Sequence, residues 1–378
     1  MEKIKVLRYG LGQVAALCVL CGMAGCASWS NGPQKDSSYQ VDSRQLVSPQ
    51  LLEQAGLETL WDNKLPMRES EKLERLFILG NRIYGLSDHN YFVCLNREKG
   101  NVIFSRNIAD AGLLIVGLGF YEGELLSIAG NRLVEINPEF GTETSGKLLE
   151  FSAVCPAVRN SGHFYLAGTD RRLHALRAED KVQVFEASAD NDSMITSIVA
   201  DENFVVFATE GGNCISIAPD GPKKLWQFDA ADGIVGPIVR NEDSLVLASK
   251  DTNVYKIDIS TGKLVWKYQT AAVLDKGPLV TKDTVYQYVR DKGLAAIDNK
   301  SGKALWQLAE GVDLLAESAG KAYVITNTGR LVVMDNEKAK QLYSVNCAAV
   351  SRYVTNAADS KIYIADKAGR IACLRPVE

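Results

Sequence analysis

Short apolar runs alternate with polar turns along most of the chain. From about residue 57 onward, runs such as Ser244–Ser249 and Val254–Asp258 flank short polar segments. Alternation of this kind predicts brief β-strands joined by tight turns. Glycine turns follow many of the runs, and several other runs are preceded by proline, at Pro156, Pro237 and Pro278. The pattern therefore predicts an all-β chain.

The strands recur with a period of about forty residues. One apolar residue ends the third strand of each unit, and we call these residues anchors. The steps between successive anchors are 41, 40, 41, 40, 40, 37 and 40 residues. Four short strands in forty residues make one β-propeller blade, so the chain predicts an eight-bladed β-propeller over residues 57–378. The eight anchors are Leu95, Ile136, Leu176, Ile217, Ile257, Ile297, Met334 and Leu374.

A second regularity is an aromatic residue nine positions after the anchor. It is present in six repeats, as Phe104, Phe185, Trp226, Trp266, Trp306 and Tyr343. The second repeat has Ser145 there, with Phe151 as the aromatic that could compensate, and the eighth repeat ends too early to have this position. Near the start of the chain, Trp61 lies in a strand-like run that no anchor precedes. We therefore predict that the N-terminal strand completes the last blade and closes the ring, which removes open sheet edges.

Two repeats carry this pattern most clearly, Ile257–Trp266 and Ile297–Trp306, each with a glycine turn before the tryptophan. They resemble the repeat of pyrroloquinoline-quinone-type (PQQ-like) propellers, and the resemblance covers about residues 57–378. In that family the aromatic docks against the glycine turn of a neighbouring blade. The resemblance thus implies structural docking for Trp61, Phe104, Phe185, Trp226, Trp266, Trp306 and Tyr343. Such a repeat specifies the fold and leaves the function open.

The N-terminus resembles a bacterial lipoprotein leader. Lys3, Lys5 and Arg8 precede an apolar stretch that is too short for a comfortable transmembrane helix. The stretch ends in Met23-Ala24-Gly25-Cys26, which is similar to a lipobox. We predict that residues 1–25 are a signal peptide and that Cys26 becomes the acylated N-terminus. An ordinary signal peptide followed by a chance cysteine is the alternative.

Residues 26–56 are predicted to hold the lipidated cysteine, a flexible tether and a short helix. Residues 27–47 are polar and lack apolar periodicity, which is typical of a linker. Ser48 and Pro49 are favoured residues at the cap and the first position of a helix, and Gly56 would end it. The predicted domain order is therefore leader, tether with helix, and propeller.

Composition narrows the classes of function. The net charge is −4, and it becomes −6 without residues 1–25. A mildly acidic chain with no basic run gives no reason to expect nucleic-acid binding. Five cysteines remain beyond Cys26, an odd number without a CxxC pair, and we interpret them as buried small residues. These five are Cys94, Cys155, Cys214, Cys347 and Cys373.

No motif in the sequence predicts catalysis, a metal or a cofactor. There are three histidines, and neither HExxH nor GxSxG occurs. The Gly117-Leu118-Gly119 run lacks a third glycine, and the acidic clusters at 190–192 and 201–202 lack EF-hand spacing. Quinoprotein dehydrogenases in the same family stack a tryptophan on the quinone. Here the tryptophans are Trp29 in the tether, Trp61 and the three docking residues, so none is left for that role.

Three hypotheses of function follow. The first is a non-catalytic, lipid-anchored scaffold that binds envelope protein partners, with the outer-membrane barrel-assembly machinery as the candidate implied by the resemblance to short propeller lipoproteins. The second is a propeller lipoprotein that binds a ligand or polymer in another envelope pathway, and the third is a PQQ-dependent oxidoreductase. Ala27 and Ser28 lack the aspartate that retains lipoproteins at the inner membrane in enteric bacteria, which favours the periplasmic face of the outer membrane. Recognition usually lies on loops of a rigid scaffold, and the residues we would test first are Asp170, Arg171, Arg172, Asp190, Asp192 and Glu210.

Overall fold

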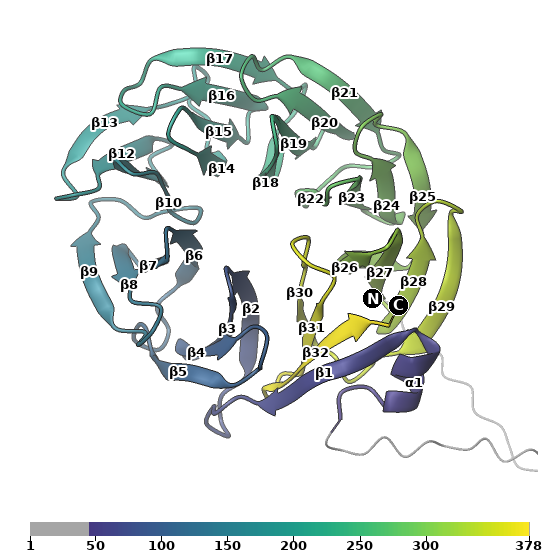
Figure 1. Cartoon of the computed structure of the whole chain (residues 1–378). Coiled ribbons are helices and arrows are strands. Elements are labelled where there is room, and N and C mark those ends of the chain that lie inside the picture. The colour runs from purple at the N-terminus through teal and green to yellow at the C-terminus, as the bar shows by residue number, and fades with distance from the viewer. Residues whose placement is uncertain (1–44, 378) are drawn as a thin grey trace, which may run out of the picture. The chain divides into compact units, whose positions relative to one another are not determined.

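The computed structural model describes residues 45–377, which form a ring of eight four-stranded antiparallel sheets (Figure 1). Each sheet is one blade, and in blades 1 to 7 the strands follow one another in chain order from the inside of the ring outward. The predicted eight-bladed β-propeller is therefore confirmed.

The first four blades are built from consecutive strands. Blade 1 contains β2 (Leu73–Leu79), β3 (Arg82–Ser87), β4 (Tyr91–Asn96) and β5 (Val102–Asn107). Blade 2 contains β6 (Ile115–Tyr121), β7 (Glu124–Ala129), β8 (Arg132–Ile136) and β9 (Glu143–Leu148). Blade 3 contains β10 (Val158–Arg159), β11 (His163–Ala167), β12 (Leu173–Arg177) and β13 (Gln183–Ala187). Blade 4 contains β14 (Ile195–Ala200), β15 (Val205–Thr209), β16 (Asn213–Ile217) and β17 (Lys224–Asp229).

Blades 5 to 7 follow the same plan, and blade 8 departs from it. Blade 5 contains β18 (Ile234–Asn241), β19 (Ser244–Ser249), β20 (Asn253–Asp258) and β21 (Leu264–Gln269). Blade 6 contains β22 (Leu279–Val280), β23 (Thr284–Val289), β24 (Gly293–Asp298) and β25 (Ala304–Leu308). Blade 7 contains β26 (Gly311–Ser318), β27 (Lys321–Thr326), β28 (Arg330–Asp335) and β29 (Lys340–Asn346). Blade 8 contains β30 (Arg352–Val354), β31 (Ile362–Ala365), β32 (Arg370–Pro376) and, as its outermost strand, β1 (Leu57–Lys64).

The ring closes through β1, as the complementary chain ends predict. Strand β1 pairs antiparallel with β32 from Leu57 opposite Pro376 to Lys64 opposite Arg370. The register shifts between Thr59 and Trp61, which lets the Trp61 side chain turn toward blade 1. The N-terminal strand thus supplies the edge strand that the C-terminus lacks.

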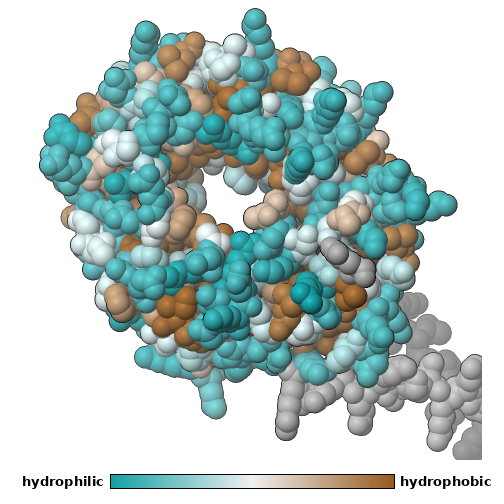
Figure 2. Space-filling model, viewed as in Figure 1, coloured by the Kyte–Doolittle hydropathy of each residue, from teal (hydrophilic) through white to brown (hydrophobic). Residues whose placement is uncertain are grey.

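The core consists of apolar side chains packed between adjacent blades. All eight anchors are buried, and each lies in the third strand of its blade. Burial arises because successive side chains of a strand point to opposite faces of the sheet, and both faces of a blade meet a neighbouring blade. Figure 2 shows that the middle of the ring is hollow on the face drawn.

The predicted short helix exists as α1 (Pro49–Gln54). Ser48 is its N-cap and its side chain accepts a hydrogen bond from the Leu51 amide, and Gly56 follows the helix with a φ of +65°. Leu46 and Val47, which the sequence assigns to the tether, are instead buried with Leu52 against blades 7 and 8. The part of the chain that packs against the propeller therefore begins at Leu46, before the helix, because Leu46 and Val47 fill space between blades 7 and 8.

Candidate functional site

The contact surfaces between blades, which we call seams, hold most of the aromatic residues singled out in the sequence. Trp226 and Trp266 lie in the outermost strands of blades 4 and 5. Their side chains pack against the next blade, at the turn between its third and fourth strands. A Cβ on Gly262 would come within 2.5 Å of Trp226, and a Cβ on Gly302 within 2.7 Å of Trp266. Both turn glycines have positive φ, so they satisfy the turn and leave room for the indole.

Each docked indole also donates a hydrogen bond at the same place in the next blade. The Nε1 of Trp226 donates to the carbonyl oxygen of Ile259 and that of Trp266 to the carbonyl oxygen of Asn299, both at 2.9 Å. Trp306 donates to Oδ1 of Asn336 at 2.8 Å. The acceptor residue always lies two positions past the anchor. A buried indole N–H needs such a partner. The hydrogen bond therefore gives these tryptophans a structural role in joining two blades.

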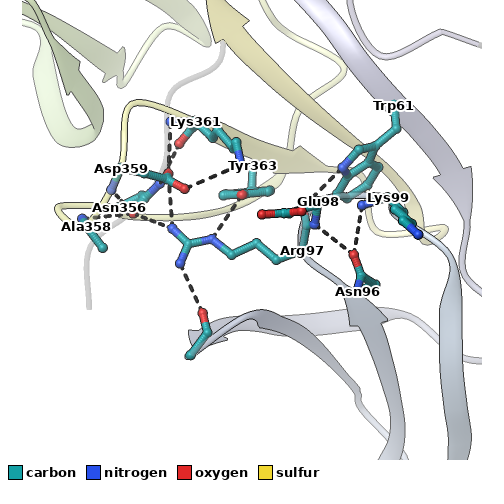
Figure 3. A network of polar contacts seen from close by, with 11 residues as sticks. Trp61, Asn96, Arg97, Glu98, Lys99, Asn356, Ala358, Asp359, Lys361 and Tyr363 are labelled. Carbon is teal, nitrogen blue, oxygen red and sulfur yellow. Dashed lines mark hydrogen bonds and ion pairs between the residues drawn. The ribbon is translucent and has the colours of Figure 1, made fainter.

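The closing seam between blades 8 and 1 uses the same device with more polar contacts (Figure 3). Trp61 lies on Gly100 and donates to the Arg97 carbonyl at 3.2 Å. The Arg97 guanidinium donates to the Tyr363 hydroxyl at 3.1 Å and pairs with Asp359 at 3.0 Å. The seam between the last and first blades thus combines a docked tryptophan with a polar network around one arginine.

Phe104 docks on Gly141 between blades 1 and 2, where a Cβ on Gly141 would come within 2.3 Å of the phenyl ring.

Two other seams use different chemistry. At seam 2/3, Ser145 takes the aromatic position and accepts from Lys181 at 2.7 Å, while Lys181 occupies the glycine position with a φ of +58°. The Lys181 ammonium is buried and lies 2.5 Å from the Glu135 carboxylate. A polar triad therefore replaces the aromatic–glycine pair.

Phe185 and Tyr343 do not follow the tryptophan pattern. Phe185 is half-buried and packs toward blade 4, where the turn has Pro222 at the glycine position. Tyr343 was expected to dock, and this expectation is wrong because the side chain is 47% exposed. Blade 8 has no turn between its third and fourth strands, because β32 and β1 are not consecutive in the chain, so Tyr343 has no such turn to dock against. Phe151, the residue that could compensate in blade 2, packs against the apolar cluster between blades 2 and 3 and stacks on His174 with ring centroids 3.7 Å apart.

The structure brings the loop residues selected from the sequence onto one face of the ring. Asp170, Arg171 and Arg172 lie in the turn between β11 and β12, and Glu210 lies in the equivalent turn of blade 4. Asp190–Asp192 belong to the linker from β13 to β14. Antiparallel strands place second-to-third-strand turns and blade-to-blade linkers at the same end of the blades. We call this group of loops, residues 168–172, 188–194 and 210–213, the rim of blades 3 and 4.

Ion pairs connect two loops of this rim and tie the rim to the neighbouring strands β13 and β17. Arg171 pairs with Asp192 at 3.0 Å across the blade boundary, and Lys224 pairs with Asp190 at 3.1 Å. Arg172 pairs with Glu186 and holds the pKa of that carboxyl below its usual range. These groups are exposed, so the pairs order the surface more than they stabilise the fold.

A groove of about 490 Å³ runs beside the rim at seam 3/4. Arg172, Glu186, Asp190 and Lys224 contribute its polar wall, and Ile215, Ile217 and Pro222 line its apolar side. The groove lies where no tryptophan–glycine pair fills the seam. The sequence indicated the charged loops, but it gave no signal that they border an open groove.

His174 lies buried beneath the Asp170 turn. Its Nε2 is 3.0 Å from Asp170, and its Nδ1 is 3.2 Å from the Gln183 side-chain oxygen. A Cβ on Gly168 would come within 3.0 Å of both His174 and Phe151. The histidine is therefore a packed core residue that shapes the turn, consistent with the sequence interpretation.

The described cysteines have no partner sulfur and are all buried. Burial raises the pKa of the Cys155 and Cys373 thiols to about 12 and that of Cys347 to about 11. A thiol attacks and binds metals as its thiolate, so these groups are suited to packing. Cys26 and the predicted leader lie outside the described residues.

Within residues 45–377, no group of three or more His, Cys, Asp or Glu side chains is placed to hold a metal ion. Asp201, one of the acidic residues considered for calcium, instead pairs with Arg240 at 2.7 Å. Over the same range, no helix has the length and hydropathy of a membrane span.

The eightfold arrangement and the aromatic–glycine seams define the class, and comparison with known proteins agrees. Residues 214–349 match the family model described as "Outer membrane protein assembly factor BamB". The chain is therefore an eight-bladed β-propeller that is similar to PQQ-like propellers over residues 214–349. Within that class it is similar to BamB. The crystal structure of BamB from Moraxella catarrhalis superposes with a TM-score of 0.66 at 14% identity, covering 84% of this chain and 97% of the other.

Two further solved structures share the fold. The computationally designed Ika8 protein gives a TM-score of 0.63 at 14% identity, covering 82% of this chain and 98% of that one. The C-terminal WD40 domain of Sif2 gives 0.62 at 12% identity, covering 84% and 98%. No curated protein sequence gives a significant match to the chain. At these identities the structural likeness concerns the fold alone.

Proposed function

We propose that the chain is a non-catalytic scaffold, anchored by lipid at the periplasmic face of the outer membrane, that binds protein partners in outer-membrane protein assembly. The observation that carries this proposal is the rim of blades 3 and 4. Charged loops from two blades converge there beside a groove, on a ring whose blades are joined by buried apolar contacts. Loops positioned by a rigid scaffold are the usual place for recognition.

The similarity to BamB supports the assembly pathway. The matched family is described as an outer-membrane protein assembly factor, and the match covers blades 5, 6 and 7 with the outer half of blade 4. The side chains of the seams support a binding role as well. All four tryptophans within residues 45–377 contact the next blade, which leaves none of them for a quinone in the channel.

The rim can be tested with a variant that removes its charges and keeps its fold. We choose Arg171→Ser, Arg172→Ser, Asp190→Asn, Asp192→Asn and Glu210→Gln together, and we leave Asp170 in place because it contacts the buried His174. The matched control is Arg290→Ser with Asp275→Asn, an ion pair at 2.8 Å in the equivalent turn and linker of blade 6. Pull-down from solubilised envelope should recover partners with wild type and control, and fewer with the rim variant.

The opposite result is equally clear. Equal recovery by the rim variant would show that partners bind elsewhere. Recovery of no protein by wild type, together with quinone-dependent dye reduction by the purified chain, would overturn the scaffold in favour of an oxidoreductase.

The lipid anchor needs its own test, because Cys26 lies outside the described residues. Growth with a radioactive fatty acid should label the wild-type chain and leave Cys26→Ala unlabelled. Label retained in Cys26→Ala would contradict the proposal. Fractionation of the labelled chain with outer-membrane vesicles would support the proposed location.

A further inference from the structure

A second cleft lies on the face of the ring opposite the rim of blades 3 and 4. It has a volume of about 380 Å³ and lies where the innermost strands of blades 2, 3 and 4 end. Strands β6 and β10 provide its walls, and residues 200–202, at the end of β14, complete it. First-to-second-strand turns occupy this face, whereas the rim loops occupy the other.

The walls of the cleft are apolar. Leu118, Leu126, Pro156 and Val158 line it, and Phe120 stands at its edge with 42% of its surface exposed. A phenylalanine this exposed on the wall of a cleft leaves apolar area that a partner can cover. The cleft therefore offers a pocket for an apolar side chain.

The glycine pair noted in the sequence explains how the cleft is built. A Cβ on Gly117 would come within 2.5 Å of Pro156, and a Cβ on Gly119 within 2.6 Å of the Ala157 carbonyl oxygen. The two glycines let the entry segment of blade 3 press against β6. Gly117-Leu118-Gly119 is thus a packing motif that shapes the cleft.

The polar edge of the cleft carries an uncompensated negative charge. Glu202 accepts hydrogen bonds from the Ser161 amide at 2.9 Å and the Tyr121 hydroxyl at 3.0 Å. Ser161 lowers the pKa of Glu202, so the carboxylate is ionised at neutral pH. Among the described residues, no basic side chain forms an ion pair with Glu202.

The one arginine in the cleft is already engaged. Arg159 lies over the Tyr121 ring at 5.1 Å and pairs with Glu124 at 2.7 Å and Glu135 at 3.3 Å. Its charge is therefore matched within blades 2 and 3. An incoming group meets apolar walls and the Glu202 carboxylate, which favours a cation and disfavours an anion.

We propose that this cleft binds an extended segment of a protein partner in which an aromatic or large aliphatic side chain lies next to lysine or arginine. The apolar side chain would cover Phe120, and the basic group would face Glu202. The inference rests on the proposed scaffold function and extends it, because two opposite faces would let one ring hold two partners at once.

The test measures binding of short labelled peptides to the full chain in detergent by fluorescence anisotropy. The probe is fluorescein-labelled Lys-Lys-Phe-Lys-Lys, with Glu-Glu-Phe-Glu-Glu and Lys-Lys-Gly-Lys-Lys as comparisons. We expect the first peptide to bind at least about tenfold more tightly than the other two, and more weakly as salt rises. Equal affinity for all three peptides would overturn the proposal.

Variants locate the site. Phe120→Ser and Glu202→Gln should each weaken the Lys-Lys-Phe-Lys-Lys complex by about tenfold. Phe140→Ser should leave it unchanged, because Phe140 is 65% exposed in the outer turn of the same blade and does not line the cleft. Unchanged affinity in Phe120→Ser, with an unchanged melting temperature, would contradict the assignment.

The rim variant separates this inference from the proposed function. It should retain the peptide and lose its envelope partners. Loss of the peptide in the rim variant would place the peptide on the other face and refute the cleft. Peptide binding by a wild-type chain that recovers no envelope partner would instead count against the scaffold alone.

Discussion

The two halves of the ring are sealed in different ways. From blade 4 to blade 7, each seam holds a tryptophan whose indole N–H is bonded to the next blade. From blade 2 to blade 4, the seams hold Ser145 with Lys181 and then Phe185 opposite Pro222. Two of the cavities described above, at seam 3/4 and beside seam 2/3, lie in the second half.

The difference teaches that a repeat can lose its docking pair without losing the fold. The anchors and strand pairings are kept in every blade, and they fix the ring. A seam without the indole is left with space and with charged groups, which are what recognition of a partner needs. Regularity in this chain therefore indicates structure, and departures from it indicate where binding should be sought.

Seam 7/8 shows a third solution. Tyr343 has no turn to meet, and the segment 46–57 packs there instead, with Leu46, Val47 and Leu52 buried against blades 7 and 8. A cavity of about 1180 Å³ remains between this segment and blade 8. The chain end that closes the ring thus also covers the seam that closure leaves without a turn.

The largest effect should come from removing the closing strand. Deleting Leu57–Lys64 takes the edge partner from β32 and removes Trp61 from Gly100. The exposed edge should aggregate or unfold the chain at ordinary temperature. Size-exclusion chromatography and circular dichroism would show it, with the exposed Glu58→Gln as a control that stays folded. A deletion variant as soluble and heat-resistant as the parent would argue against closure by β1.

The next effect separates a docked aromatic from an undocked one. Trp266→Ala should cost about 3–5 kcal/mol of unfolding free energy, because it empties a packed seam. Tyr343→Ala should cost no more than about 0.5 kcal/mol, because that side chain is exposed and contacts no turn. Denaturant unfolding measures both. Similar losses at the two positions would remove the distinction between docked and undocked aromatics.

The polar triad of seam 2/3 should be sensitive to losing one partner. Lys181→Ala removes the nearer of the two cations that pair with the buried Glu135 carboxylate, leaving Arg159 at 3.3 Å, and should cost about 1–3 kcal/mol. The double variant Glu135→Leu with Lys181→Met should recover most of that loss, because an apolar pair can replace a buried ion pair. If the double variant remained folded without recovering stability, an apolar pair could not replace the Lys181–Glu135 ion pair at this seam.

The smallest expected effect is a dependence of stability on pH from the turns of blades 5 and 6. Hydrogen bonds from Ser260 and Thr261 lower the pKa of Asp258, and Ser301 lowers that of Asp298. A carboxyl whose pKa is lower in the folded chain contributes stability above its unfolded pKa and loses it as pH falls through its folded pKa. Asp258→Asn with Asp298→Asn should therefore flatten the loss of stability below about pH 4. An unchanged acid limb of the stability curve would show that these turns contribute nothing.

The sequence predicted the fold almost completely, because the period of forty residues and the alternation of apolar positions are local signals. The anchors, the closing strand and the helix at Ser48–Pro49 all follow from such signals. The exposure of Tyr343 could not be predicted in this way. Whether it meets a turn depends on β1, which comes from the opposite end of the chain. The coincidence of Ser145 and Lys181 at the two docking positions of one seam was a readable signal of polar replacement.

The binding surfaces were predicted only in part. The charged turn at 170–172 and the acidic cluster at 190–192 are visible in the sequence, yet their meeting on one face requires the strand topology. The cleft at Phe120 gave no signal beyond two glycines, since an exposed phenylalanine cannot be told from a buried one by pattern. Pairing of charges, such as Arg159 with Glu124, likewise depends on three-dimensional contact.

Hydrogen exchange resolved by strand tests the central claim most directly, namely that docking seals the seams of one half and leaves those of the other open. The four outermost strands to compare are β17 and β21, which carry docked tryptophans, and β9 and β13, which do not. We predict that amides of β9 and β13 exchange measurably faster than those of β17 and β21, because their seams open at lower free energy. Equal protection of all four strands would contradict the account.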